Sequence, residues 1–123
     1  MICHGPIATV AAMPHARNFR EALVAQDTAK ASELAKGWQY AGYKMTIYSN
    51  SESKPVEDQL FHAKMVFHVV DALKTAGGIV SNGPDFQPYV VEDRELITGQ
   101  NPRSDHMVGA ALVRALDRSA TAT

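Results

Sequence analysis

Cys3-His4-Gly5-Pro6, a tetrapeptide near the start of this 123-residue chain, decides how the rest of the sequence is interpreted. Cys3 is the only cysteine, and a histidine, a glycine and a helix-compatible proline follow it directly. This order is typical of a nucleophile on a tight turn between a strand and a helix. Only Met1 and Ile2 precede the turn in this sequence, so we expect the strand that normally holds such a turn to be absent.

The chemistry of this tetrapeptide depends on the ionisation of Cys3. A helix N-terminus and a neighbouring imidazolium both favour a thiolate, so we expect the pKa of the thiol to be lowered. The backbone N–H of His4 would donate to an oxyanion, its imidazole would move protons, and Gly5 would let the backbone turn closely. The alternative is that Cys3 is a small buried hydrophobic residue without chemistry.

Composition and charge bound the possible functions. Apolar residues make up 46% of the chain, charged residues 20%, and the net charge is −1, which is ordinary for one globular domain spanning 1–123. The charge gives no basic field for nucleic acid, and no apolar stretch is long enough to cross a membrane. The start lacks the pattern of a signal peptide, and one cysteine cannot form an internal disulfide, so we expect a cytoplasmic protein.

Hydrophobic spacing and turn residues predict an alternation of helices and strands. A short helix begins at Pro6, and two alanine-rich surface helices follow it. A long helix begins at Ser53 as N-cap and carries one apolar face, and Ser104 caps the last helix. The expected helices are 6–12, 15–25, 29–35, 53–76 and 104–118. The expected strands are 44–48, 79–80 and a hairpin of 88–91 with 95–98 around a turn at 92–94. This alternation predicts an α/β layered fold.

Three stretches resemble the ThiJ/PfpI superfamily, a group related to class I glutamine amidotransferases. They are residues 2–6 (ICHGP), 42–48 (GYKMTIY) and 90–104 (VVEDRELITGQNPRS). The likeness covers nearly all of this chain and only the C-terminal part of the family domain. It implies a partial flavodoxin-like three-layer sandwich that starts at the nucleophile elbow and lacks the N-terminal strands.

The resemblance also implies a cofactor-independent and metal-independent site. Cys3 matches the family nucleophile, and His4 matches the histidine beside it. Glu52 is the nearest counterpart of the acidic residue that orients this histidine in some branches, and its alternative is a solvated loop carboxylate. The loop at Asn101-Pro102 would border the site. Family members include glyoxalase III enzymes, amidase- or peptidase-like hydrolases, and stress-linked chaperones or deglycases, so the substrate would be a small carbonyl or amide compound.

The sequence departs from the family in its missing first half. A glutamate that hydrogen-bonds the thiol and a glycine loop that supplies the second oxyanion donor have no counterpart here. We therefore expect either a fragment, a start assigned too late, or a complementing N-terminal half, and a chain that is weakly active alone. A homo-oligomer is a further expectation. The alternative functions are a non-catalytic chaperone or interaction module and a redox-sensing cysteine protein.

Other chemistry-bearing residues give weaker signals. His62 and His68 are six positions apart and so do not form the helical pair that binds zinc. Trp38, Tyr40 and Tyr43 either pack in the core or line a pocket mouth beside Cys3. Further residues have mainly structural interpretations, as core, subunit-contact or capping positions: Phe61, Met65, Phe67, His15 and His106.

Overall fold

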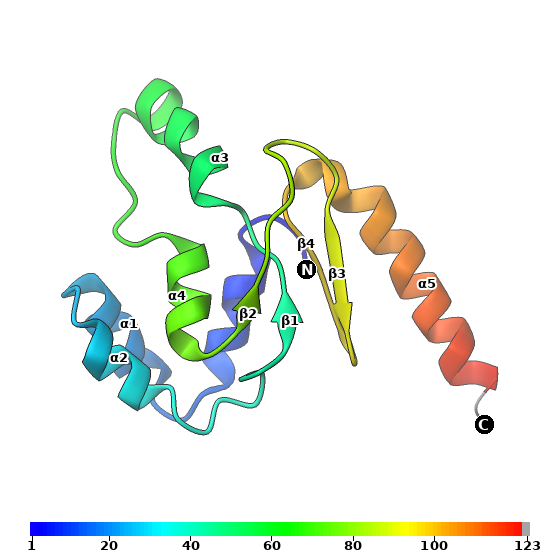
Figure 1. Ribbon diagram of the computed structural model, residues 1–123, viewed down its shortest axis with the longest axis horizontal. Coiled ribbons are helices and arrows are strands. Elements are labelled where there is room, and N and C mark those ends of the chain that lie inside the picture. Colours follow the sequence, from blue (N-terminus) through cyan, green and yellow to red (C-terminus); the bar gives the residue numbers. More distant parts are fainter. Residues whose placement is uncertain (122–123) are drawn as a thin grey trace.

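The computed structural model describes residues 1–121 and has a mixed α/β architecture. Two small sheets lie side by side, with most helices gathered beside one sheet and the last helix beside the other (Figure 1). The helical elements in chain order are the 3₁₀ helix η1 (Gly5–Ala12), α1 (Ala16–Val24), α2 (Thr28–Leu34), α3 (Asn50–Pro55), the π-helix η2 (Val56–Phe61), α4 (Val69–Ala76), the 3₁₀ helix η3 (Pro102–Ser104) and α5 (Asp105–Thr121).

Four strands form the two sheets. β1 (Lys44–Met45) and β2 (Ile79–Val80) pair in parallel, with Lys44 opposite Ile79. β3 (Val90–Asp93) and β4 (Leu96–Gly99) form an antiparallel hairpin, as predicted. The turn is shorter than expected, because Asp93 pairs with Leu96 and only Arg94 and Glu95 remain outside the ladder. The predicted strand 44–48 is also shorter, since its regular pairing ends at Met45.

The N-terminal residues connect the two sheets. Met1 accepts a hydrogen bond from the N–H of Gly99 at 2.9 Å, and the N–H of Cys3 returns one to the carbonyl of Gly99 at 2.9 Å. On the other side, the carbonyl of Cys3 accepts from the N–H of Tyr48 at 3.0 Å. Residues 1–3 therefore lie as a short extended segment between β4 and the chain that continues from β1.

Side chains of the hairpin complete the edge of β1 where this segment does not reach. The carboxylate of Asp93 accepts from the N–H of Lys44 at 2.7 Å. The hydroxyl of Thr98 accepts from the N–H of Thr46 at 2.9 Å. The two contacts satisfy a strand edge that has no neighbouring strand there. Thr46 is buried, so its N–H would be costly to leave without an acceptor.

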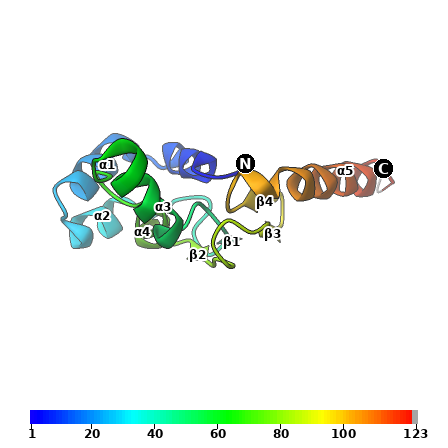
Figure 2. The same cartoon turned by 90° about the horizontal axis from the view of Figure 1, so that it is seen from above.

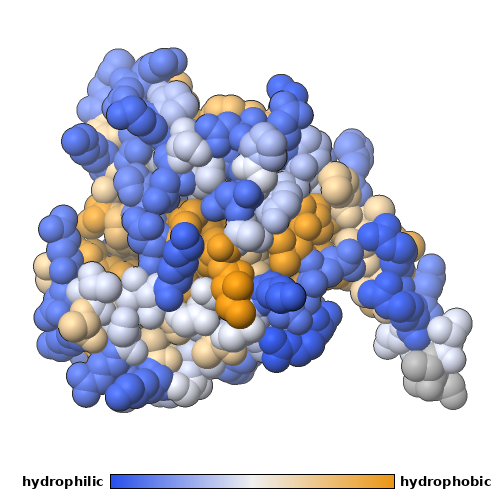
Figure 3. Space-filling view, in the orientation of Figure 1, coloured by the Kyte–Doolittle hydropathy of each residue, from blue (hydrophilic) through white to orange (hydrophobic). Residues whose placement is uncertain are grey.

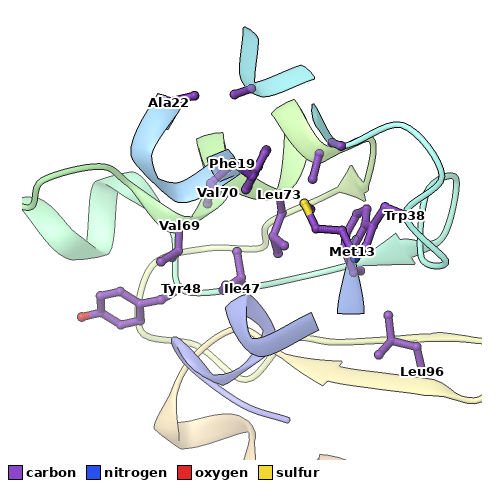
Figure 4. Close-up of a cluster of buried hydrophobic side chains, with 14 residues drawn as sticks. Met13, Phe19, Ala22, Trp38, Ile47, Tyr48, Val69, Val70, Leu73 and Leu96 are labelled. Carbon is purple, nitrogen blue, oxygen red and sulfur yellow. The ribbon is translucent and has the colours of Figure 1, made fainter. Parts of the chain in front are cut away.

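The main core lies between β1 and the helices η1, α1, α2 and α4. Phe19, Ile47 and Leu73 are fully buried and approach one another from α1, the segment after β1 and α4 (Figure 4). The predicted surface helices are confirmed, and each buries one side, with Phe19 in α1 and Ala31 in α2. This packing holds the segment after β1, which contains Ile47 and Tyr48, against the helices.

The predicted continuous helix over 53–76 is wrong. The helix begins earlier, at Asn50, because Ser49 and Glu52 form a reciprocal capping box. Pro55 lacks the N–H that an α-helix needs, and the chain passes into the π-helix η2, which ends where His62 adopts a left-handed φ of 50°. A new helix, α4, begins at Val69.

The break exposes residues that the sequence had assigned to one buried helical face. Leu60 is 69% exposed and Phe61 is 63% exposed, whereas Val69 and Leu73 in α4 are buried. Met65, which lies between these helices, is also exposed. The apolar periodicity of this region therefore belongs to two separate elements that point different ways.

The last helix projects from the body of the molecule (Figures 1 and 2). It packs on β3 and β4 through Ala111, and it continues past the expected end at Arg118. Ser104 precedes this helix as predicted, but its hydroxyl bonds to Tyr89 and Asn101 and does not cap the helix. In the first turn, the carboxylate of Asp105 accepts from the N–H of His106. Among residues 1–121, no helix combines the length and the apolar character that a membrane span requires.

The surface seen in Figure 3 is mostly polar with several apolar areas, one of them near its middle. The area near the middle lies over the region of β1 and β2. Ile79 in β2 is 54% exposed. The apolar side chains of α5 and η2 add to the exposed apolar surface: they include Leu60, Phe61, Met107, Leu112, Val113 and Leu116.

Candidate active site

Cys3 occupies a strained turn. Its φ of 57° is left-handed, a conformation that costs a non-glycine residue roughly 1–2 kcal/mol. The turn is closed by a hydrogen bond from the N–H of Gly5 to the carbonyl of Ile2 at 2.8 Å, and η1 begins at once with Pro6 in its first turn. The sequence prediction of a tight turn between an extended segment and a helix is confirmed, with a 3₁₀ helix as the second element.

The side chains of Cys3 and His4 meet at this turn. The Sγ atom of Cys3 lies 3.2 Å from Nδ1 of His4. The ring of Tyr48 packs against the imidazole, with centroids 4.6 Å apart and planes inclined by 33°. The hydroxyl of Tyr48 donates to the carbonyl of Glu52 at 3.3 Å, so both rings are fixed relative to α3.

The predicted acidification of the thiol is wrong. Burial raises the pKa of Cys3, the backbone N–H of His4 lowers it in part, and the negative charge of Glu52 raises it further. Burial also lowers the pKa of His4, against an opposing effect of Glu52. Near pH 7 the pair is therefore a neutral thiol beside a neutral imidazole, and in the tautomer with the proton on Nε2 the Nδ1 atom can take the thiol proton when sulfur reacts.

Glu52 is buried, so the alternative of a solvated loop carboxylate is wrong. Its side chain is fully covered and accepts five hydrogen bonds at 2.7–3.0 Å. The donors are the N–H and hydroxyl of Ser49, the N–H of Phe86, and the side-chain amides of Gln100 and Asn101. None of the bonds described within residues 1–121 joins Glu52 to His4, so the expected orienting contact is not seen here.

The hydrogen bonds of Glu52 determine its charge state. Burial alone would raise the pKa of the carboxyl group, but the N–H groups of Ser49 and Phe86 and the side chains of Gln100 and Ser49 lower it below its usual value. A carboxylate at this position holds together three chain segments: the start of α3, the loop at 83–87 and the loop after β4. Two of these segments form walls of the cavity beside Cys3.

Gln100 and Asn101 contact Glu52, a role that the sequence analysis did not assign to either side chain. The Nε2 of Gln100 donates to Oε1 of Glu52 at 2.8 Å, and its Oε1 accepts from the N–H of Gly83 at 2.7 Å. The Nδ2 of Asn101 donates to Oε2 of Glu52 at 2.9 Å and to the carbonyl of Gln87 at 2.8 Å. Two consecutive uncharged amides directly after a strand were the available signal, because amides can satisfy a buried carboxylate without adding charge.

A cavity of about 380 Å³ opens beside the thiol. Its wall is mainly apolar, and the π-helix η2 contributes Val56 and Phe61 to it. The expectation that the Asn101-Pro102 loop lies near Cys3 agrees with its place in this wall. The nine lining residues are Cys3, His4, Tyr48, Val56, Phe61, Phe86, Asn101, Pro102 and Arg103.

The remaining candidates lie elsewhere. Trp38 is buried and donates through Nε1 to the carbonyl of Thr9 at 2.8 Å, which is core packing. Tyr43 stacks under the guanidinium of Arg94, away from the cavity lining. His68 contacts Glu57 at 3.3 Å. Across residues 1–121, no three acidic, histidine or cysteine side chains are grouped so that they could bind a metal ion.

Comparison with known proteins gives a fold relationship. No family model matches the chain, and no curated protein matches it. A solved structure described as the crystallographic structure of APC35852 is similar to it, with a TM-score of 0.65 and 24% sequence identity. The match covers 96% of this chain and 43% of that one, so the present chain spans less than half of the solved protein. The likeness supports the mixed α/β fold alone.

Proposed function

We propose that this chain is a ThiJ/PfpI-like, cysteine-dependent enzyme region that acts on a small carbonyl compound and that its fold is part of a flavodoxin-like sandwich. The observation that carries the proposal is the distance of 3.2 Å between Sγ of Cys3 and Nδ1 of His4, in a left-handed turn on the wall of an apolar cavity. A strained turn, an adjacent base and a pocket together are characteristic of an activated nucleophile. The single free thiol agrees with a reducing, cytoplasmic setting.

With a 2-oxoaldehyde, sulfur would attack the aldehyde carbon while His4 takes the thiol proton. The carbonyl oxygen is protonated, which gives a hemithioacetal. Transfer of the proton on this carbon to the neighbouring carbonyl carbon, through an enediol, gives a thioester with no net oxidation. Water then releases a 2-hydroxy acid and restores the thiol. His4 is suited to these transfers because its neutral imidazole both accepts and donates protons.

With an amide, the same thiol would attack the carbonyl carbon and His4 would deliver its proton to the departing amine. Water would then cleave the thioester to release the acid. Both routes pass through an oxyanion, for which the elbow supplies the backbone N–H of His4. The side-chain amide of Asn101 lies in the same wall but donates to Glu52 and to Gln87. Because loss of one oxyanion donor costs roughly 10²–10³ in rate, we expect slow turnover.

The test is the conversion of methylglyoxal to lactate by the purified chain, measured as both substrate loss and product gain. We expect slow turnover that Cys3→Ala abolishes and His4→Gln reduces. His15→Gln is the matched control, since His15 is exposed and is not among the residues that line the cavity. Substrate loss that survives Cys3→Ala, or an equal effect of the two histidine variants, contradicts the proposal. A peptide amide assayed with the same variants separates the two routes.

A second candidate function is a non-catalytic interaction module that forms a homo-oligomer or binds a complementing chain segment. The observation in its favour is the exposed apolar side of α5, where Leu112, Val113 and Leu116 are each half exposed or more. Size-exclusion chromatography with light scattering tests it, with Leu112→Glu and Leu116→Glu as disrupting changes. A monomer that both variants leave unchanged contradicts this candidate. A redox-sensing role of Cys3 stays an alternative, and it depends on the same free thiol as the proposed chemistry.

A further inference from the structure

Arg103 is a permanently charged residue in the wall of an otherwise uncharged cavity. It lies in η3 and is exposed, and the other lining residues are apolar, neutral polar or the Cys3–His4 pair. Within residues 1–121, its guanidinium makes no described hydrogen bond or ion pair. Other arginines do find acidic partners, as Arg94 does with Asp93 and Arg114 with Glu92.

Three acidic groups in the segments around this cavity have described hydrogen-bond donors. Glu52 accepts five hydrogen bonds behind the wall. Asp85 accepts from the hydroxyls of Ser49 and Ser51, and Asp105 accepts from the N–H of His106 at the start of α5. Arg103 is the one arginine or lysine among the residues that line the cavity, and its guanidinium has no described partner within residues 1–121.

The backbone around Arg103 is held rigidly. Asn101 and Ser104 on either side are buried, and the hydroxyl of Ser104 bonds to both the N–H and the carbonyl of Tyr89. Pro102 restricts the backbone further, because its ring fixes φ. A fixed backbone keeps the base of the Arg103 side chain beside the cavity, so only the side chain itself has to be ordered when an anion binds.

We infer that the cavity selects a carbonyl compound that carries a carboxylate, which Arg103 binds while the apolar part of the compound packs against Val56, Phe61 and Phe86. This inference rests on the proposed function and names its substrate class. The planar guanidinium matches a carboxylate with two parallel hydrogen bonds. One positive charge balances a carboxylate, whereas the doubly charged form of a phosphate monoester would keep an uncompensated charge in this apolar wall.

The negative charge of Glu52 opposes the binding of an anion beside Cys3, and the positive charge of Arg103 offsets this effect. The negative charge of Glu52 raises the pKa of the Cys3 thiol, so its field reaches the place where a substrate would react. The same field repels an anion near Cys3. Removal of the positive charge at Arg103 should therefore leave a site that disfavours anions and prefers neutral compounds.

Alkylation of Cys3 by iodoacetate and by iodoacetamide tests the inference. The two reagents share a leaving group and differ in charge, and the chain has one cysteine. Both react with the same thiolate population, so their rate ratio is independent of the thiol pKa. We expect the iodoacetate-to-iodoacetamide ratio of the folded chain to exceed that of the urea-unfolded chain by about three- to fivefold, a modest effect because Arg103 is exposed. Added salt should reduce the excess.

Two variants separate the effect of Arg103 from general charge. Arg103→Gln should bring the ratio to the unfolded value or below it, and Arg20→Gln, an exposed arginine outside the cavity lining, should keep the excess. Equal ratios in the folded and unfolded wild-type chain, or equal effects of the two variants, contradict the inference. The alkylation ratio does not depend on enzymatic turnover. Failure of the inference would therefore appear in this ratio, and failure of the proposed function would appear in the methylglyoxal assay.

Discussion

The hydroxyl of Thr98 in β4 accepts a hydrogen bond from the backbone N–H of Thr46 at 2.9 Å and donates to the carbonyl of Val91 at 3.4 Å. A side chain thus replaces a neighbouring strand at the edge of β1. Both threonines are fully buried, so water cannot take over the bond. This contact and the bond between Asp93 and Lys44 bring the two sheets together just below the turn that carries Cys3.

Thr98→Val should lower the free energy of unfolding by about 1–3 kcal/mol, because it leaves the buried N–H of Thr46 without an acceptor. Urea denaturation measures the effect. Thr75→Val is the matched control, since the side-chain hydroxyl of Thr75 makes no described hydrogen bond within residues 1–121. A loss of similar size in both variants would show that the hydroxyl of Thr98 does not have the role assigned to it.

Glu52→Gln should destabilise the chain by about 2–4 kcal/mol at pH 7, because the amide group of glutamine points donors at some of the groups that now donate to the carboxylate. The pKa of Glu52 is lowered in the folded chain, so its stabilisation is present above its unfolded value of 4.5 and is lost as the pH falls through the folded pKa. The difference between wild type and variant should therefore shrink in acid.

Glu33→Gln provides the comparison for this change, since Glu33 is exposed in α2 and has no described ion pair within residues 1–121. Its stability should match that of the wild type at every pH. Urea denaturation from pH 3 to pH 7 covers the range in which the two variants differ. A pH-independent gap between wild type and Glu52→Gln would exclude the carboxylate charge as the cause.

The rate of Cys3 alkylation by iodoacetamide should rise with pH with a midpoint above 9.0, the value of an unperturbed thiol. Burial and the charge of Glu52 both disfavour the thiolate, and the N–H of His4 offsets only part of this. The urea-unfolded chain should titrate at a lower pH than the folded chain. A folded midpoint below the unfolded one would restore the acidic thiol that the sequence predicted.

Gly99→Ala should lower stability by about 1–3 kcal/mol, since an added Cβ would lie 2.8 Å from Cβ of Ser104 and 3.0 Å from Cγ2 of Ile2. The change would push α5 and residues 1–3 away from β4. Gly109→Ala, within α5, meets open space and should be neutral or stabilising by about 0.5–1 kcal/mol. Thermal unfolding of both variants checks the contrast, and equal behaviour would contradict the close approach at Gly99.

Local signals predicted much of the fold. Pro6 indicated the helix after the turn, and the apolar residues at 88–91 and 95–98 indicated the hairpin. The prediction of one long helix was wrong because apolar spacing alone does not show where a helix begins or breaks. The capping box of Ser49 with Glu52 starts the helix earlier, and the missing N–H of Pro55 interrupts it. Sequence spacing records periodicity, but it does not show where a helix ends when the apolar pattern continues.

The sequence predicted that Cys3 and His4 lie together, but it did not predict the direction in which the pKa of the thiol is shifted. Cys3 and His4 lie together because they are adjacent on a tight turn, which the order of residues indicated. The raised thiol pKa results from burial in the tertiary structure and from the charge of Glu52, 49 positions along the chain. Likewise, the five donors to Glu52 come from three segments, and their convergence is a property of the tertiary structure.

Reaction of the folded chain with p-nitrophenyl acetate tests most directly whether Cys3 and His4 act as nucleophile and base. The account predicts one acetyl group on the tryptic peptide that contains Cys3, formed faster than in the urea-unfolded chain and slowed by His4→Gln but not by His15→Gln. Absence of acetylation at Cys3, or acetylation at the rate of the unfolded chain with no dependence on His4, would contradict it.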